Sequence, residues 1–378
     1  MSKQISTATE TNLGENKLMK IRNLALALTV SALVLPLQAA DVGVGTSYLS
    51  LPISVTAAQP LFLGAALARP PIMKGWLAGD VAAAATSFTT ANSASNSNMF
   101  SGLIVETGAE DGSGATPLTD NNYVVEITSG PSTGLIKIVT AFGANQITVK
   151  GGLPALTLGT TFTLRKDHTL ASLFGNVDSA SALTHSGLTS GSTAGSADVV
   201  SVLDSTGAWK KFFFRTGTGW KLTTARTGSD RGNVRVSLGT GVLLNPVTTK
   251  IISVSGEYRG TRSRVSLINQ ATIVANPFPV ATTLANSDLA TSLAKGSTAS
   301  SSDELRFLEN GAFVNYFARS GTGTTSPSGV AYLGFKPSLN RTGASVDTTK
   351  SIAAGGAVLV KRAGDVHDLV FRPQYITK

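Results

Sequence analysis

Residues 130–134, Gly-Pro-Ser-Thr-Gly, match the G-x-S-x-G pattern that carries the nucleophile in many serine hydrolases. That chemistry needs a strand, a sharp turn and a helix, which together lift the serine above a sheet beside a histidine base. Here strand-like sequence flanks the pattern on both sides, and nothing singles out His168, His185 or His367 as the base. We therefore interpret residues 130–134 as a hairpin turn and predict no catalytic residue and no enzymatic activity.

The segment Asp365-Val-His-Asp368 places an imidazole between two carboxylates. A Zn²⁺ site needs three or four converging ligands. Asp365 and His367 would share one face of a strand, but no partner motif accompanies them. We expect a surface turn that leads into an apolar strand at residues 369–371, and neither a metal nor a cofactor.

A Gly-rich acidic stretch contains Glu106, Glu110, Asp111 and Asp120. Clusters of carboxylate oxygens can hold Ca²⁺. The spacing does not fit an EF-hand loop, in which ligands recur at fixed alternate positions. A solvated loop is the simpler interpretation, and Glu110, Asp111 and Asp120 remain calcium candidates only.

Basic residues are concentrated between positions 209 and 264. The whole chain has a net charge of +9, and this segment alone carries eleven Lys and Arg residues against Asp230 and Glu257. A basic surface attracts anionic polymers such as acidic polysaccharides or lipopolysaccharide phosphates. The candidate polyanion-binding residues combine basic and aromatic side chains: Trp209, Lys210, Lys211, Arg215, Arg235, Tyr258, Arg259, Arg262 and Arg264.

Two interpretations of these cations stay open. Strand alternation would place Tyr258, Arg262 and Arg264 on one face of a strand. It would likewise place Trp209, Lys211, Phe213 and Arg215 on one face of another strand. Such faces could bind a polyanion. Alternatively, the cations coat solvent-facing strand positions and discourage edge-to-edge pairing. Nucleic acid is not expected as a partner of an exported protein.

The segments that contain these residues are predicted to be β-strands. Apolar and polar residues alternate over 123–128, a Gly- and Pro-containing turn follows at 129–134, and a returning strand covers 135–140. Residues 146–150 and 161–165 repeat the pattern, and no segment after residue 40 shows helical periodicity of useful length. Gly, Ser, Thr, Ala and Val dominate, as in chains of short strands joined by turns. Polar loops are predicted at 86–98, 179–197 and 297–302.

An internal duplication is the strongest signal along the chain. The segment Gly-Ala-Trp-Lys-Lys-Phe-Phe-Phe-Arg-Thr-Gly-Thr-Gly at 207–219 recurs at 311–323 as Gly-Ala-Phe-Val-Asn-Tyr-Phe-Ala-Arg-Ser-Gly-Thr-Gly. Gly-Ser-Thr-Ala at 191–194 likewise recurs at 296–299. Both copies predict an aromatic strand that ends in Arg before a Gly-Thr-Gly turn. The second copy lacks the paired lysines, which weakens the polyanion interpretation.

The duplication predicts an all-β protein of two or three sandwich-like or barrel-like units. We expect an N-terminal β-domain at residues 41–168, then two copies of one β-unit at 169–282 and 283–378.

The chain resembles a family of secreted, uncharacterised β-rich proteins found as paralogous sets in Verrucomicrobia-like bacteria. Three motifs carry the resemblance through their order: the hairpin at 123–134 with Asn-Gln-Ile-Thr-Val at 145–149, Val-Ala-Asn-Pro-Phe-Pro-Val at 274–280, and Ala-Ala-Gly-Gly-Ala-Val-Leu-Val-Lys-Arg at 353–362. The resemblance implies export and β-structure, and it implies no activity and no site.

Residues 1–40 have the layout of a secretory signal peptide. A short positive region at Lys20 and Arg22 precedes an apolar run at 24–35 and the small residues Ala39 and Ala40. Met19, directly before the charged region, is the expected true start. No transmembrane segment is expected in the mature chain. The chain has no cysteine, which excludes disulfides, thiol nucleophiles and thiolate metal sites.

Together these features predict an exported, non-enzymatic structural or adhesive protein of the cell surface or extracellular matrix, with possible homo-assembly through unpaired strand edges. The periplasm is the alternative location. The alternative function is an anionic-glycan or polyanion-binding module that uses residues 209–264.

Overall fold

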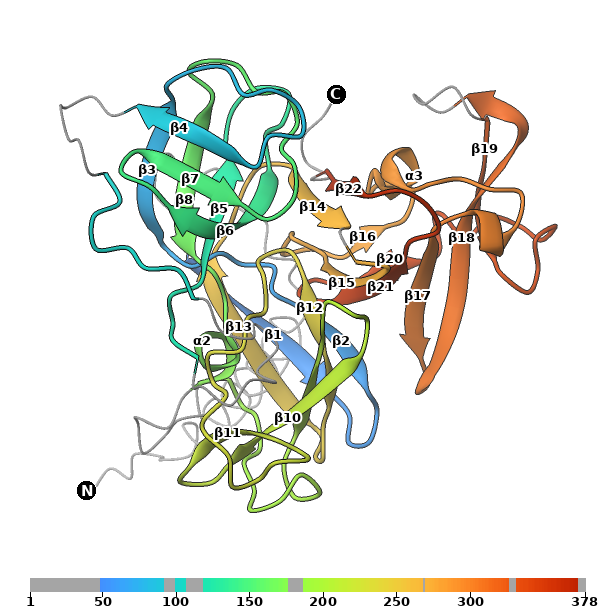
Figure 1. The fold of residues 1–378 in the computed structure, drawn as a ribbon. Helices are drawn as coiled ribbons and strands as arrows, with labels where there is room; N and C mark the ends of the chain where they lie inside the picture. Colours follow the sequence, from blue (N-terminus) through green and yellow to red (C-terminus); the bar gives the residue numbers. More distant parts are fainter. Residues whose placement is uncertain are drawn as a thin grey trace, which may run out of the picture. The chain divides into compact units, whose positions relative to one another are not determined.

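The computed structural model describes residues 48–91, 99–106, 118–175, 186–267, 269–325 and 331–372 (Figure 1). The described part of the chain is nearly all β, with 46% of its residues in strands and 4% in helices, which confirms the predicted fold class. The two short helices are α2 (Leu170–Phe174) and α3 (Leu289–Ser292). Within the described ranges, no helix has the length and apolar character needed to span a bilayer. The expected signal peptide at residues 1–40 and the expected start at Met19 lie outside these ranges.

Six antiparallel strands form a closed barrel. They are β3 (Pro71–Leu77), β4 (Ser87–Ala91), β5 (Tyr123–Ile127), β6 (Leu135–Phe142), β7 (Gln146–Val149) and β8 (Thr161–Lys166). Around the barrel the order is β3-β4-β7-β6-β5-β8, and β8 pairs again with β3. Alternate side chains point inward and fill the interior, among them Leu77, Phe88, Val125 and Phe162.

The hairpin predicted around residues 129–134 is the β5–β6 connection. The N–H of Gly134 donates to the carbonyl oxygen of Ile127 at 2.7 Å, and Gly130 and Gly134 have φ of 73° and 86°. Glycine is favoured there because side chains rarely adopt this backbone conformation. The predicted loop at 86–98 is wrong in its first part, because β4 turns Phe88 and Thr90 into buried positions.

A first β-unit combines strands from before and after the barrel. Its strands are β1 (Tyr48–Val55), β2 (Leu61–Gly64), β9 (Val199–Leu203), β10 (Trp209–Arg215), β11 (Gly219–Leu222), β12 (Gly241–Asn245) and β13 (Lys250–Glu257). The sheet order is β11-β10-β9-β12-β2, and β1 pairs separately with β13. Trp220 and Phe212 lie fully buried in its core.

A second β-unit follows. Its strands are β14 (Ser263–Leu267), β15 (Ala271–Ala275), β17 (Glu304–Glu309), β18 (Ala312–Thr325), β19 (Ala331–Pro337), β21 (Ala357–Lys361) and β22 (His367–Phe371), with the short pair β16 (Thr282–Thr283) and β20 (Ser351–Ile352). The sheet order is β15-β21-β17-β18-β19. Strand β14 pairs with β22 and, in parallel, with β6 of the barrel.

The two β-units share one strand order. The order β11-β10-β9-β12-β2 in the first sheet corresponds, strand for strand, to β19-β18-β17-β21-β15 in the second. The antiparallel pair β1–β13 likewise corresponds to β14–β22. The equivalence extends to single bonds. Gly191 donates to Phe214 at 3.2 Å and accepts from Thr216, just as Gly296 donates to Ala318 at 3.2 Å and accepts from Ser320.

The strand pairing crosses the boundaries expected from the sequence. Strands β1 and β2 lie within residues 41–168 but pair with β13 and β12. Strands β14 and β15 lie within 169–282 but pair with β22 and β21 of the second unit. The barrel is therefore inserted between β2 and β9 of the first unit. Local sequence patterns do not encode such distant pairings, which explains the difference.

The Gly-Thr-Gly segments differ between the two units. In the first, Thr216–Thr218 form the tight turn between β10 and β11, and Gly217 and Gly219 have φ of 72° and 86°. In the second, strand β18 continues to Thr325, so the turn predicted at 321–323 is wrong. The β18–β19 hairpin is longer, and its register is shifted near Ser320.

The two sheets meet where β2 contacts β15, and at the end of each strand a hydrogen bond runs to the segment that precedes β21 or β12 of the other unit. Gly64 donates to the carbonyl oxygen of Gly355 at 2.8 Å, and the equivalent Ala275 donates to Gly239 at 2.9 Å. Phe62 and Ile273, which are equivalent in the two units, share a small apolar cluster with Leu359. Equivalent residues of the two units thus make equivalent contacts with each other, as the two subunits of a two-fold dimer do, although both units belong to one chain.

Candidate functional site

Charged side chains lie on the outer face of the barrel where the β-units cover it. Along β5, Val125 and Ile127 point into the barrel, so alternation turns Glu126 outward. Arg165 on β8 is placed outward in the same way beside Leu164. Both charged residues are nevertheless buried, because the two β-units pack against this face.

Two carboxylates and two guanidinium groups form one buried cluster there. Arg259 Nη1 lies 3.0 Å from Glu126 Oε1, and Arg165 Nη1 lies 2.5 Å from Glu257 Oε2. Arg165 Nε is also 3.6 Å from Glu126 Oε2. The four formal charges cancel, as burial requires. The cluster links β5 and β8 of the barrel to the end of β13 and the segment that leads into β14.

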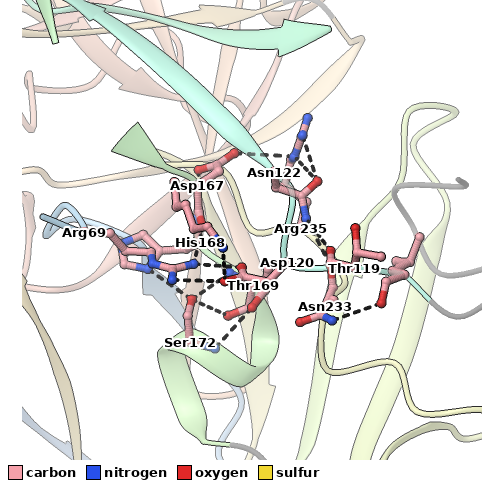
Figure 2. Close-up of polar contacts among 12 residues, drawn as sticks. Arg69, Thr119, Asp120, Asn122, Asp167, His168, Thr169, Ser172, Asn233 and Arg235 are labelled. Carbon is pink, nitrogen blue, oxygen red and sulfur yellow. Dashed lines mark hydrogen bonds and ion pairs between the residues drawn. The ribbon is translucent and has the colours of Figure 1, made fainter. Parts of the chain in front are cut away.

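A second buried network adjoins the end of β8 (Figure 2). The carboxylate of Asp167 accepts from the backbone N–H groups of His168 at 2.9 Å and Leu238 at 2.8 Å. Arg235 Nε lies 3.5 Å from Asp167 Oδ2, and Arg235 also donates to Asn122 Oδ1 at 2.8 and 3.1 Å. Burial raises the pKa of Asp167, although Arg235 and the backbone donors oppose that rise.

His168 is fixed in a neutral state beside this network (Figure 2). Its Nε2 lies 2.5 Å from the carbonyl oxygen of Leu67, which can only accept, so Nε2 carries the proton. Burial lowers the pKa of His168 to about 4. Ser172 Oγ is 3.4 Å from Nδ1 but also donates to the carbonyl oxygen of Thr169 at 3.1 Å and caps helix α2. Ser172 therefore stabilises the N-terminus of helix α2, and its contact with His168 is not that of a serine nucleophile with a base.

The serine of the G-x-S-x-G pattern, Ser132, is part of a turn and is not placed as a nucleophile would be. Ser132 is buried in the β5–β6 turn, between two strands and without a following helix. His168 contacts Leu67 and Ser172, and His367 faces Asp303. His185 lies outside the described residues.

Of the calcium candidates, only Asp120 is described, since Glu110 and Asp111 lie outside the described ranges. Its two oxygens pair with Arg69 Nη1 at 2.8 Å and Lys166 Nζ at 3.0 Å. Burial raises the pKa of Asp120, but the hydrogen bonds from Arg69 and Lys166 outweigh it and the pKa is lowered. Among the described residues, no group of three or more His, Asp or Glu side chains could hold a metal ion.

Several predicted polyanion-binding residues have partners inside the protein. Arg235 and Arg259 are buried and paired with Asp167 and Glu126. Three further cations make contacts with nearby groups: Arg264 donates to Pro131 O at 2.7 Å, Arg215 to Arg226 O at 3.1 Å, and Lys210 lies 3.8 Å from Asp204.

The remaining candidates differ in exposure. Lys211 and Arg262 are exposed, whereas Trp209 and Tyr258 are half-buried. Burial raises the pKa of Tyr258 to about 12. The face expected to carry Tyr258, Arg262 and Arg264 does not form within one strand, because β13 ends at Glu257 and β14 begins at Ser263.

Two equivalent buried aspartates, Asp198 and Asp303, were not predicted by the sequence analysis. Asp198 Oδ2 accepts from the N–H of Thr189 at 2.7 Å, and its Oδ1 accepts from Val247 at 2.8 Å. Asp303 makes the equivalent bonds with Ala294 at 2.9 Å and Ala363 at 2.8 Å. Each carboxylate also faces one cation, which is Lys250 in the first unit and His367 in the second.

Both sheets have a covered outer edge. On β11 the N–H of Trp220 donates to Asp230 Oδ1 at 2.7 Å, and on β19 the N–H of Phe335 donates to Asp347 Oδ1 at 2.6 Å. The carbonyl oxygens of the same two strand residues accept from Arg231 and Val346. The loops that follow these strands therefore occupy the hydrogen-bonding groups that another strand would use.

Comparisons with known protein families, curated proteins and solved structures find no match to this chain.

Proposed function

We propose that this chain is an exported, non-enzymatic structural or adhesive protein of the cell surface or extracellular matrix. The observation that carries the proposal is that buried charged side chains of this chain pair with one another. The ion pairs Glu126–Arg259, Arg165–Glu257 and Asp167–Arg235 are buried, and they join the barrel to the surrounding β-strands. Such groups hold modules together and are not available to a substrate.

We propose that other molecules bind to the faces of the sheets and not to the edges of β11 and β19. Asp230 and Asp347 occupy those edges, and the inner edges of β2 and β15 lie at the reciprocal contact between the units. Strand β1 pairs with β13, and it contains Pro52, which has no N–H to offer to a further strand. Covered edges favour controlled assembly over open-ended strand pairing.

The experiment is size-exclusion chromatography with light scattering, followed by negative-stain electron microscopy, on the chain from Asp41 onward. We expect defined oligomers, or attachment of the monomer to cell-surface polysaccharide. A monomer that binds no surface polymer would contradict the proposal, and so would turnover of a polysaccharide from a substrate panel.

Polyanion binding remains the second candidate, because Trp209 and Lys211 lie two residues apart on β10 and therefore share a face, with Lys211 exposed. Retention on a sulfated-polysaccharide column should then fall with salt and with Lys211→Ala combined with Arg262→Ala. Lys361→Ala, at another exposed lysine, is the matched control. Equal retention of the double variant and the control would rule out this candidate.

A further inference from the structure

The first residue of β22 is fastened to the body of the second β-unit through a histidine. His367 lies opposite Leu267 of β14, and its Nε2 is 2.9 Å from Asp303 Oδ2. The side chain of Asp303 has no exposure to solvent and also accepts the backbone N–H groups of Ala294 and Ala363.

Both ring nitrogens of His367 lie close to acceptor oxygens, and this arrangement favours the doubly protonated ring. Nδ1 lies 2.9 Å from the carbonyl oxygen of Asp365, which can only accept a hydrogen bond. Nε2 faces the carboxylate of Asp303, which when ionised also only accepts. A neutral imidazole has a single N–H, so only the imidazolium serves both oxygens. The hydrogen bond with Asp303 raises the pKa of His367, although burial opposes it.

The other charged groups near His367 do not replace Asp303 as its partner. Arg362 opposes protonation through its positive charge. Asp368, the next residue in β22, accepts a hydrogen bond from the hydroxyl of Ser266 on β14, and that hydroxyl accepts from Lys137 of the barrel. On the side of α3, Asp288 pairs with Arg372 at the other end of β22.

The first β-unit provides an internal comparison. There Asp198 makes the equivalent backbone bonds and pairs with Lys250, the first residue of β13. A lysine keeps its charge across the physiological pH range, whereas histidine changes charge within it. The same attachment is therefore permanent in one unit and titratable in the other.

We propose that the His367–Asp303 pair is a pH-sensitive latch that holds the start of β22 closed while the imidazole is protonated and loosens as the proton is lost. This proposal concerns a device within the fold and does not depend on the proposed function.

The direction in which the stability of the latch changes with pH follows from the linkage between proton binding and folding. A histidine with a raised pKa in the folded state contributes stability that is fully present below its unfolded pKa of about 6.5 and is lost as pH rises through the folded pKa. At the acidic limit Asp303 is the controlling group. Its hydrogen bonds, chiefly that with His367, outweigh the effect of burial and lower its pKa. The latch should therefore be closed in mildly acidic solution and looser in alkaline solution.

The test is hydrogen exchange of the β22 amides in the whole chain from Asp41 onward, at pH 5.5 and pH 8.5, with correction for intrinsic exchange. The opening constant of β22 should rise roughly tenfold at the higher pH for each pKa unit by which the histidine is raised. The variant His367→Lys should show no such rise. Equal pH dependence in the wild type and His367→Lys would overturn the proposal.

Two further variants keep the test decisive. Lys250→His should introduce the same pH dependence at β13 and leave β22 unchanged. If His367→Lys does not fold, His367→Gln, which cannot be protonated, should open readily at both pH values. A His367→Gln protein that stays as protected as the wild type at pH 5.5 would contradict the latch.

Discussion

Arg259 donates a hydrogen bond to Glu126 across 3.0 Å, and both side chains are only 3% exposed. The two residues lie 133 positions apart in the chain. Glu126 belongs to barrel strand β5, whereas Arg259 lies between the last strand of the first β-unit and the first strand of the second. One buried pair thus joins the barrel to the segment that connects the two β-units.

Removal of one partner of this pair should strongly destabilise the protein. Glu126→Ala would leave Arg259 and Arg165 buried without their shared carboxylate, and loss of one member of a buried ion pair typically costs about 3–5 kcal/mol. The free energy of unfolding in urea measures the effect. Glu304→Ala, in the more exposed Glu304–Arg306 pair, should cost less than about 1 kcal/mol. Similar losses in the two variants would contradict the account.

Acid should destabilise the fold through His168. Its pKa falls to about 4 in the folded protein because burial disfavours the charged ring, whereas the unfolded chain binds a proton near pH 6.5. Stability should therefore be lost as pH falls from about 6.5 toward 4, by roughly 3 kcal/mol in total from this group. Urea unfolding of the wild type and His168→Gln over this range checks the prediction. An equally steep pH dependence in His168→Gln would assign the loss to other groups.

The equivalent glycines of the two β-units should tolerate no side chain. A Cβ at Gly191 would lie 2.4 Å from Ser196 Oγ, and one at Gly296 would lie 2.4 Å from Ser301 Oγ, with backbone atoms within 2.7 Å in both cases. Each alanine variant should lose about 1–3 kcal/mol of unfolding free energy. Gly195→Ala is the control, because its Cβ would meet nothing within 4 Å. If Gly191→Ala unfolds at the same urea concentration as Gly195→Ala, the close packing is absent.

The aspartates at the sheet edges should limit aggregation. Asp230→Ala would free the N–H of Trp220 on β11, and Asp347→Ala would free that of Phe335 on β19. Each variant should lose about 1–3 kcal/mol and form larger particles on gentle warming, because an open edge can pair with another chain. Light scattering during a temperature ramp measures this. Asp365→Ala, at an exposed turn, is the control, and identical scattering from all three variants would contradict the role.

Much of the local structure could be predicted from the sequence. Alternation located β5, and the Gly-Pro-Ser-Thr-Gly segment located the β5–β6 turn, because both signals lie within a few neighbouring residues. The strands that pair over long distances could not be predicted in this way. Tyr48 pairs with Glu257, and no pattern around either residue indicates the other.

The polar sites were harder to predict for a similar reason. Lys and Arg are mostly exposed in proteins, so a basic segment suggests a surface. Arg235 and Arg259 are exceptions because Asp167 and Glu126, both distant in sequence, compensate their charges. Glu126 at the centre of an apolar strand was the one available signal of a buried charge. The sequence around His367 pointed to the neighbouring Asp365 and Asp368, whereas its partner in the fold is the distant Asp303.

The most direct test of the proposed surface role is protease accessibility on intact cells of the organism that makes the protein. A tagged copy of the full chain would be followed through cell fractionation, and whole cells would be treated with a protease that does not cross the membrane. The account predicts that the protein is found in the surface or extracellular fraction and is cleaved without cell lysis. Recovery of the intact protein from the cytoplasm, protected until the cells are broken, would contradict it.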